Sequence, residues 1–81
     1  MPSLTYYVAL PFIRTADGLL APEQALEAPN RNTAIAAAKR LALTKAGAIA
    51  FARTGDPALG EFSDAEILAK FGDVPEDLSE L

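Results

Sequence analysis

The chain has 81 residues, of which 51% are hydrophobic and 22% are charged, and its formal net charge is −4. This length suits a single domain, because independent domains usually have at least about 50 residues. The sequence contains no Cys and no His, which excludes disulfides, thiolate chemistry, zinc–thiolate sites and catalysis by histidine. The core must therefore come from apolar packing alone or be shared with a second chain.

The remaining groups with acid–base chemistry are carboxylates, lysines, Tyr6 and Tyr7. Such groups act as general acids or bases only where burial or a close charge tunes them, and the sequence shows no arrangement of that kind. We therefore predict that the protein is not an enzyme and that it has no catalytic residue, cofactor or metal.

The N-terminal residues carry no sign of a targeting or membrane segment. Met1–Thr5 lacks the basic start and the apolar stretch of a secretory signal. The apolar run of residues 6–13 is too short to cross a bilayer, and Pro11 interrupts it. We therefore expect a soluble, cytoplasmic protein that does not contact a membrane.

The first predicted element is a strand over residues 6–14, which are rich in β-branched and aromatic side chains. Its alternation places Tyr6 and Phe12 on one face and Tyr7 on the other. Pro11 has no N–H group, so we expect this strand to lie at the edge of a sheet or to carry a bulge there.

A tight turn and a second strand are predicted next. Asp17-Gly18 is a strong hairpin signal, because glycine readily adopts the positive φ that such a turn requires. The returning strand is expected within residues 19–28, where Pro22 makes it irregular. A competing interpretation begins a short helix at Pro22, since proline suits the first helical position. We favour the strand.

Residues 33–46 predict a long helix, because they consist mainly of Ala, Leu, Lys and Arg. Asn30 or Asn32 would cap its first turn, and Gly47 would end it in a left-handed conformation. Leu43 widens the apolar surface beside the main apolar arc of the helix. That arc consists of Ile35, Ala38, Leu41, Ala42 and Ala46.

Residues 48–53 predict a third strand, antiparallel or parallel to the hairpin, with Phe51 on one face and only alanines on the other. We expect the alanine side to pack against the preceding helix. Residues 54–60 contain Asp56-Pro57 and two glycines, which predicts a turn or loop. For residues 62–71, a capping box at Ser63–Glu66 favours a short helix, whereas a return beside the third strand is equally compatible with the sequence.

These elements predict one α+β domain over residues 1–72, in which a β-hairpin is followed by one long helix, a third strand (ββαβ) and a C-terminal fourth strand or short helix. Residues 73–81 are predicted to form an acidic, flexible tail. The order is similar in outline to small double-stranded-RNA-binding-like folds and some antitoxin domains. No motif residue of either family is found, and a fold outline by itself carries no function.

The acidic loop after the third strand invites two hypotheses that its spacing excludes. Ala58 and Gly60 occupy positions where a calcium loop needs side-chain oxygens. Gly55 and Gly60 are spaced as in a phosphate-binding loop, but Glu61-Phe62 stands where such a loop has Lys and Ser or Thr. We interpret these residues as turn residues.

Tyr6, Tyr7 and Phe51 are aromatic residues on strands, as in several folds that stack unpaired bases. Such surfaces need surrounding cations, yet the chain is acidic, with +3 on residues 1–55 and −7 on residues 56–81. We therefore do not expect nucleic-acid binding, and we assign these rings to a core or an interface.

The function that remains is a small non-enzymatic protein–protein interaction or assembly module, which associates with itself as a homodimer or with a protein partner. The candidate interface residues are Tyr6, Tyr7, Phe12, Leu41, Leu43 and Phe51. The alternative is a small-ligand or nucleotide-binding accessory domain that uses the loop of residues 53–60.

Overall fold

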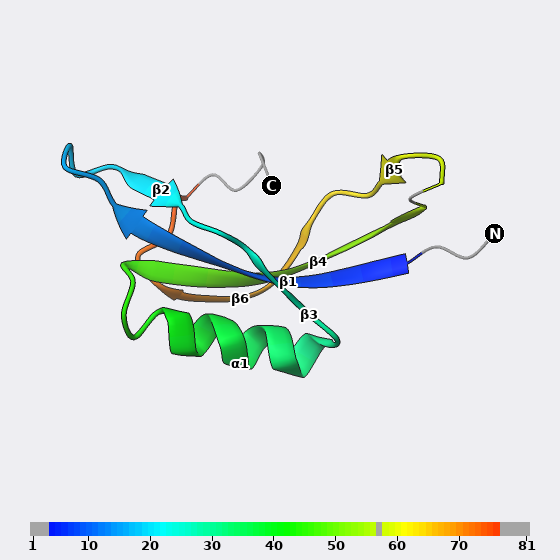
Figure 1. Cartoon of the computed structure of the whole chain (residues 1–81), viewed down its shortest axis with the longest axis horizontal. Coiled ribbons are helices and arrows are strands. Elements are labelled where there is room, and N and C mark those ends of the chain that lie inside the picture. The colour runs from blue at the N-terminus through cyan, green and yellow to red at the C-terminus, as the bar shows by residue number, and fades with distance from the viewer. Residues whose placement is uncertain (1–3, 57, 77–81) are drawn as a thin grey trace.

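The structure is a computed structural model, and it describes residues 4–56 and 58–76 (Figure 1). Its elements in chain order are β1 (Leu4–Arg14), β2 (Leu20–Pro22), β3 (Leu26–Ala28), α1 (Arg31–Leu41), β4 (Gly47–Asp56), β5 (Glu61–Phe62) and β6 (Glu66–Gly72). The strands form one antiparallel sheet with β1 and β4 at its centre. Short β2 and β3 follow the outer side of β1, and β5 and β6 follow the outer side of β4. The predicted α+β fold is confirmed.

One face of the sheet packs against α1 through alanines (Figure 1). Ala34 and Ala38 of the helix are fully buried against Ala9 of β1 and against Ala48 and Ala50 of β4. Because none of these side chains extends beyond Cβ, the helix backbone lies close to the sheet. The predicted contact between the alanine side of the third strand and the helix is confirmed.

The opposite face of the sheet carries the large side chains of the core. Leu10, Phe12 and Ile49 are exposed by 8%, 3% and 0%, respectively, and they form one cluster. Val74, which follows β6, packs against this cluster. The second residue of the predicted tail therefore packs against the core, while residues 77–81 lie outside the described part of the chain.

The helix begins two residues before the predicted start and ends five residues before the predicted end. Asn30, one of the two predicted caps, accepts a hydrogen bond from the backbone N–H of Thr33 through Oδ1 at 2.8 Å. The predicted end at Ala46 is wrong, since the helix ends at Leu41. The backbone N–H of Ala46 donates to the carbonyl of Phe12 at 2.9 Å, so pairing with the sheet overrides the helix propensity of the residues before it.

Gly47 is not the left-handed helix terminator that the sequence predicts. It is the first residue of β4, and its φ is not among the positive values, which occur at Gly18, Gly60 and Gly72. A Cβ on Gly47 would lie 2.2 Å from the carbonyl oxygen of Asp73. Glycine is needed here because the chain leaving β6 crosses directly over it.

Pro11 is not at a sheet edge as expected, because β1 pairs with strands on both sides. Its carbonyl accepts a hydrogen bond from Glu23 at 2.9 Å, on the side of β2 and β3. In an antiparallel pair, the N–H and C=O of one residue face the same neighbour. The missing N–H of Pro11 therefore faces the point where the second strand is interrupted and its register moves by one residue. The predicted edge position or bulge of this strand is therefore wrong, because the irregularity lies in the neighbouring strand.

Both regions with competing predictions are strands. The second strand lies within residues 19–28 as the two pieces β2 and β3, so the helix from Pro22 is wrong. After the turn, the chain returns as β5 and β6, and β6 pairs with β4 from Glu66 to Gly72. A helix over residues 63–71 would leave the outer backbone groups of β4 unpaired. The strand alternative for the C-terminal element is therefore confirmed.

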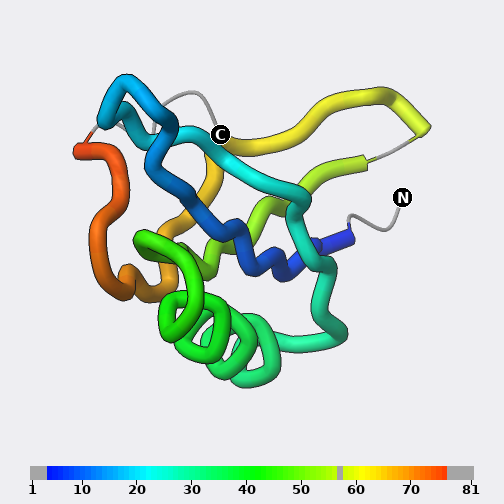
Figure 2. Tube along the Cα trace, turned by 60° about the vertical axis from the view of Figure 1, so that its left-hand side comes forward, coloured from blue at the N-terminus to red at the C-terminus, as the bar shows by residue number. Residues whose placement is uncertain are grey.

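The ends of β1 and β4, together with β5, project beyond α1 at one end of the molecule (Figures 1 and 2). We call this part the arm, and it consists of residues 4–7, residues 52–56 and β5. The predicted loop begins later than expected, because β4 continues to Asp56.

In the described part of the chain, no helix is long and apolar enough to span a membrane.

Replacement of Gly47 by Ala should lower the free energy of unfolding by at least about 2 kcal/mol, because the new Cβ would overlap backbone atoms that cannot move independently. Gly60→Ala is the control: its φ is +68°, but nothing lies within 4 Å, so we expect a loss of roughly 1 kcal/mol. Urea denaturation of both variants measures the difference, and an equal loss would contradict the crowding argument.

A chain ending at Gly72 should be less stable than a chain ending at Glu76 by about 2 kcal/mol. The shorter chain loses the packing of Val74 and the hydrogen bond from the Asp73 N–H to the Ala46 carbonyl at 2.9 Å. Thermal melts of the two truncated chains test this. Identical melting temperatures would place the end of the domain at residue 72 as the sequence predicts.

Candidate interaction surface

The structure separates the six interface residues that the sequence predicts. Tyr6 and Phe51 lie on the face opposite α1, because Tyr6 is four residues from Leu10 and Phe51 is two residues from Ile49, both of the second core cluster. Tyr7 packs against the helix-side core instead. Phe12 is only 3% exposed and belongs to the core, so it offers no surface to a partner. Its assignment to an interface is corrected.

The other two predicted interface residues lie around the end of the helix. Leu41 is half-buried in the last turn of α1, and Leu43 is 82% exposed in the turn that follows. Neither residue lies on the strand face that carries Tyr6. A single interface of all six residues is therefore not formed by one protomer.

The face of the arm opposite α1 gathers large side chains from three strands. Tyr6 pairs with Arg53 across β1 and β4. Leu4 pairs with Gly55, which pairs in turn with Phe62 of β5. Residues directly opposite each other in an antiparallel pair share a face, so these side chains lie together. We call this group the aromatic patch, and it consists of Leu4, Tyr6, Arg53 and Phe62 of the arm together with Phe51, which precedes the arm on β4 and packs against the second core cluster.

Two aromatic rings of the patch are in contact. The ring centroids of Tyr6 and Phe62 lie 5.9 Å apart with an interplanar angle of 51°, within the range of favourable tilted pairs. Gly55 makes this contact possible, because a Cβ there would lie 2.5 Å from Cδ1 of Phe62. Leu4 and Phe62 remain 48% and 45% exposed, respectively.

Hydroxyl groups hold the strands of the arm together. The backbone N–H of Ser63 donates to the carbonyl of Thr54 at 2.8 Å, and the Ser63 hydroxyl donates to the same carbonyl at 2.9 Å. The hydroxyls of Thr5 and Thr54 are hydrogen-bonded at 2.9 Å. Because Thr5 and Thr54 alternate with Tyr6 and Arg53, these hydroxyls lie on the face away from the patch. Beyond Tyr7, which packs against the helix-side core, the arm is therefore polar on the face away from the patch.

Arg53 is the cation of the patch, and its charge is not neutralised within the described residues. Its Nε is shielded from solvent and makes no hydrogen bond there. The two ion pairs of these residues, Arg14–Asp73 and Lys45–Glu23, do not include it. A polar group that loses water without gaining a partner costs free energy. In the sequence analysis, Arg53 belongs to the third strand and to the candidate ligand loop but not to the interface, although its position two residues after Phe51 places both on one strand face.

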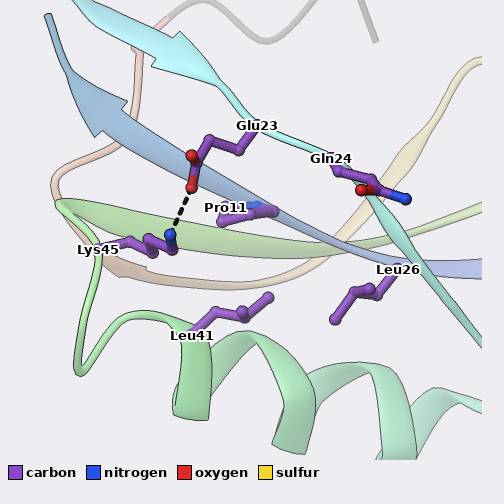
Figure 3. Close-up of a pocket in the computed structure, with 6 residues that line it drawn as sticks. All are labelled: Pro11, Glu23, Gln24, Leu26, Leu41 and Lys45. Atoms are coloured by element: carbon purple, nitrogen blue, oxygen red, sulfur yellow. Dashed lines mark ion pairs between the residues drawn. The ribbon is translucent and has the colours of Figure 1, made fainter.

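A cleft of about 290 Å³ lies elsewhere, between the end of α1 and the interrupted second strand (Figure 3). Its lining residues are Pro11, Glu23, Gln24, Leu26, Leu41 and Lys45. Lys45 Nζ and Glu23 Oε1 form an ion pair at 2.7 Å across it. The cleft follows from Pro11, because the strand interruption that faces Pro11 supplies one of its walls. It lies apart from the predicted ligand loop of residues 53–60.

Comparison of the chain with protein-family models, with curated proteins and with solved structures finds no match. Within residues 4–56 and 58–76, no group of three or more acidic side chains is arranged to hold a metal ion. The function is therefore argued from the surface chemistry of the arm and the cleft.

Replacement of Arg53 by Met should leave the free energy of unfolding unchanged or raise it by up to about 1 kcal/mol, because Met keeps the apolar stem and removes an unpaired buried nitrogen. Lys70→Met is the matched control, since Lys70 is an exposed cation that pairs with Ile49 on the same face. Urea denaturation of both variants gives the comparison. A loss for Arg53→Met of more than about 1 kcal/mol beyond the control would assign Arg53 a role in stability.

Proposed function

We propose that the chain is a small protein–protein interaction or assembly module without catalytic activity, and that it binds its partner through the aromatic patch. The observation that carries this proposal is the collection of large apolar side chains and one unpaired cation on a single face of the arm, beyond the end of α1. Exposed apolar groups that gather in one place are typical of interaction sites.

The composition of the patch supports a protein partner. Tyr, Phe and Arg are enriched at protein interfaces, where aromatic and guanidinium groups supply much of the binding free energy. Burial of one large apolar side chain contributes about 1.5–3 kcal/mol. Leu4 and Phe62 are each about half exposed, so both have apolar surface left to bury against a partner.

The sheet edges are poor alternatives for this contact. The edge beside β1 is divided into β2 and β3 with a change of register, and β6 has a register shift opposite Ala50 and Phe51. Irregularities of this kind blunt an edge against strand addition. We therefore propose that the partner binds the face of the arm and not a sheet edge. The homodimer that the sequence favours would use the same face, so a second copy and another protein would compete for it. We also propose that the protein is cytoplasmic.

Small-ligand binding is the second candidate function, and the cleft beside Pro11 favours it. The cleft combines apolar side chains with the Glu23–Lys45 ion pair, a mixture typical of small-molecule sites. The sequence places a candidate ligand site at the loop of residues 53–60, whereas this second candidate function places it at the cleft.

The double variant Tyr6→Ser/Phe62→Ser should lose its partners, because it removes the two rings that form the centre of the patch. The measurement is affinity capture on the immobilised chain, with retained proteins, including added untagged copies of the chain, quantified by mass spectrometry. Proteins held by the wild type should fall by at least about tenfold. Leu43→Ser, which changes a Leu that is 82% exposed outside the patch, should retain them. Equal retention by the double variant would contradict the proposal.

A further inference from the structure

Building on the proposed function, we propose that the aromatic patch binds a polypeptide segment of mixed charge. A carboxylate of that segment pairs with Arg53, and apolar side chains beside the carboxylate cover Leu4, Tyr6 and Phe62. The argument rests on the state of Arg53, on the charges around the patch and on the rings that flank it.

The Nε–H group of Arg53 has no acceptor within the described residues. A guanidinium has five N–H donors in a fixed plane, and Nε of Arg53 is shielded from water without a hydrogen bond. Arg53 lies directly opposite Tyr6 of the neighbouring strand and two residues from Phe51 on its own strand, so the three side chains share one face. A carboxylate matches the planar donor geometry of a guanidinium and can accept two of its hydrogen bonds at once.

The charges around the patch favour a polypeptide over a nucleic acid. Glu61 pairs with Asp56 and Glu66 pairs with Ala52, so both carboxylates lie on the opposite face from the patch. Asp64 is exposed in the segment between β5 and β6. A phosphate backbone needs several cations along its path, whereas the patch offers one arginine. A polypeptide can supply both signs, with one acid for Arg53 and a basic residue for Asp64.

The rings then determine what surrounds the carboxylate. Phe62 is 45% exposed and lies against Tyr6, so both offer apolar surface directly beside the cation. Burial of this surface by a partner removes water from the ion pair and strengthens it. We therefore expect an Asp or Glu flanked by aromatic or aliphatic residues, rather than an isolated acid.

The test selects peptides of about a dozen residues from a random phage-displayed library on the immobilised wild-type chain. Enriched sequences should contain an Asp or Glu next to apolar residues and a Lys or Arg further along. A synthetic peptide of the enriched sequence should bind at least about tenfold more weakly to Arg53→Gln than to the wild type, because a charge-assisted hydrogen bond is lost. Lys70→Gln is the matched control and should bind as the wild type does.

The outcomes distinguish this inference from the function on which it rests. If Tyr6→Ser/Phe62→Ser abolishes peptide binding while Arg53→Gln preserves it, the patch is an interaction site and the carboxylate partner is wrong. Enriched peptides without an acid would overturn the inference in the same way. If the wild type binds a fluorescent oligothymidine and Arg53→Gln does not, the ligand of the patch is a nucleic acid and the peptide partner is wrong. Failure to enrich any peptide that depends on the patch would overturn both proposals.

Discussion

The close packing of alanine against alanine between α1 and the central strands is the constraint on which the rest of the structure depends. Ala34 and Ala38 of the helix meet Ala9, Ala48 and Ala50 with no space for larger side chains. The centre of this contact therefore accepts only small side chains, and larger residues such as Tyr7 and Phe71 pack around it. Because strand residues alternate between faces, most large residues of β1 and β4 lie on the opposite face, which forms the second core near Ile49 and the aromatic patch on the arm.

Much of this arrangement could be predicted from local patterns in the sequence. The alternation in residues 6–14, the Asp17-Gly18 turn and the alanine side of the third strand predict the hairpin and the contact with the helix. The end of the helix could not be predicted from local propensity. Ala46 is a good helix former, but its backbone N–H donates a hydrogen bond to the carbonyl of Phe12 in the sheet. The sequence also does not decide between a helix and a strand for the C-terminal element. Its capping box favours a helix, whereas pairing with β4, a tertiary contact, makes it a strand.

The candidate site was only partly predictable because it depends on register. Sequence alternation separates Tyr6 from Tyr7 but does not show which residues of other strands lie beside Tyr6. The pairing of Tyr6 with Arg53, and the approach of Phe62 over Gly55, join residues that are far apart in the sequence. Burial of Phe12 likewise depends on packing by Val74 and Ile49 across the same face. These are tertiary facts that composition and periodicity do not contain.

Arg53 shows how the requirements of the fold and of binding diverge at one position. The helix-side packing needs only that Ala52 be small, and β4 needs only extended backbone at the next residue, so neither requires a cation there. An apolar residue would avoid the unpaired Nε among aromatic neighbours. Local conflicts of this kind are expected where a surface serves a partner, because binding resolves what folding leaves unsatisfied. The unpaired Nε costs the free chain stability at the arm. In the binding that we propose, a carboxylate-bearing partner would gain from this over an apolar competitor, which would bury the guanidinium without pairing it.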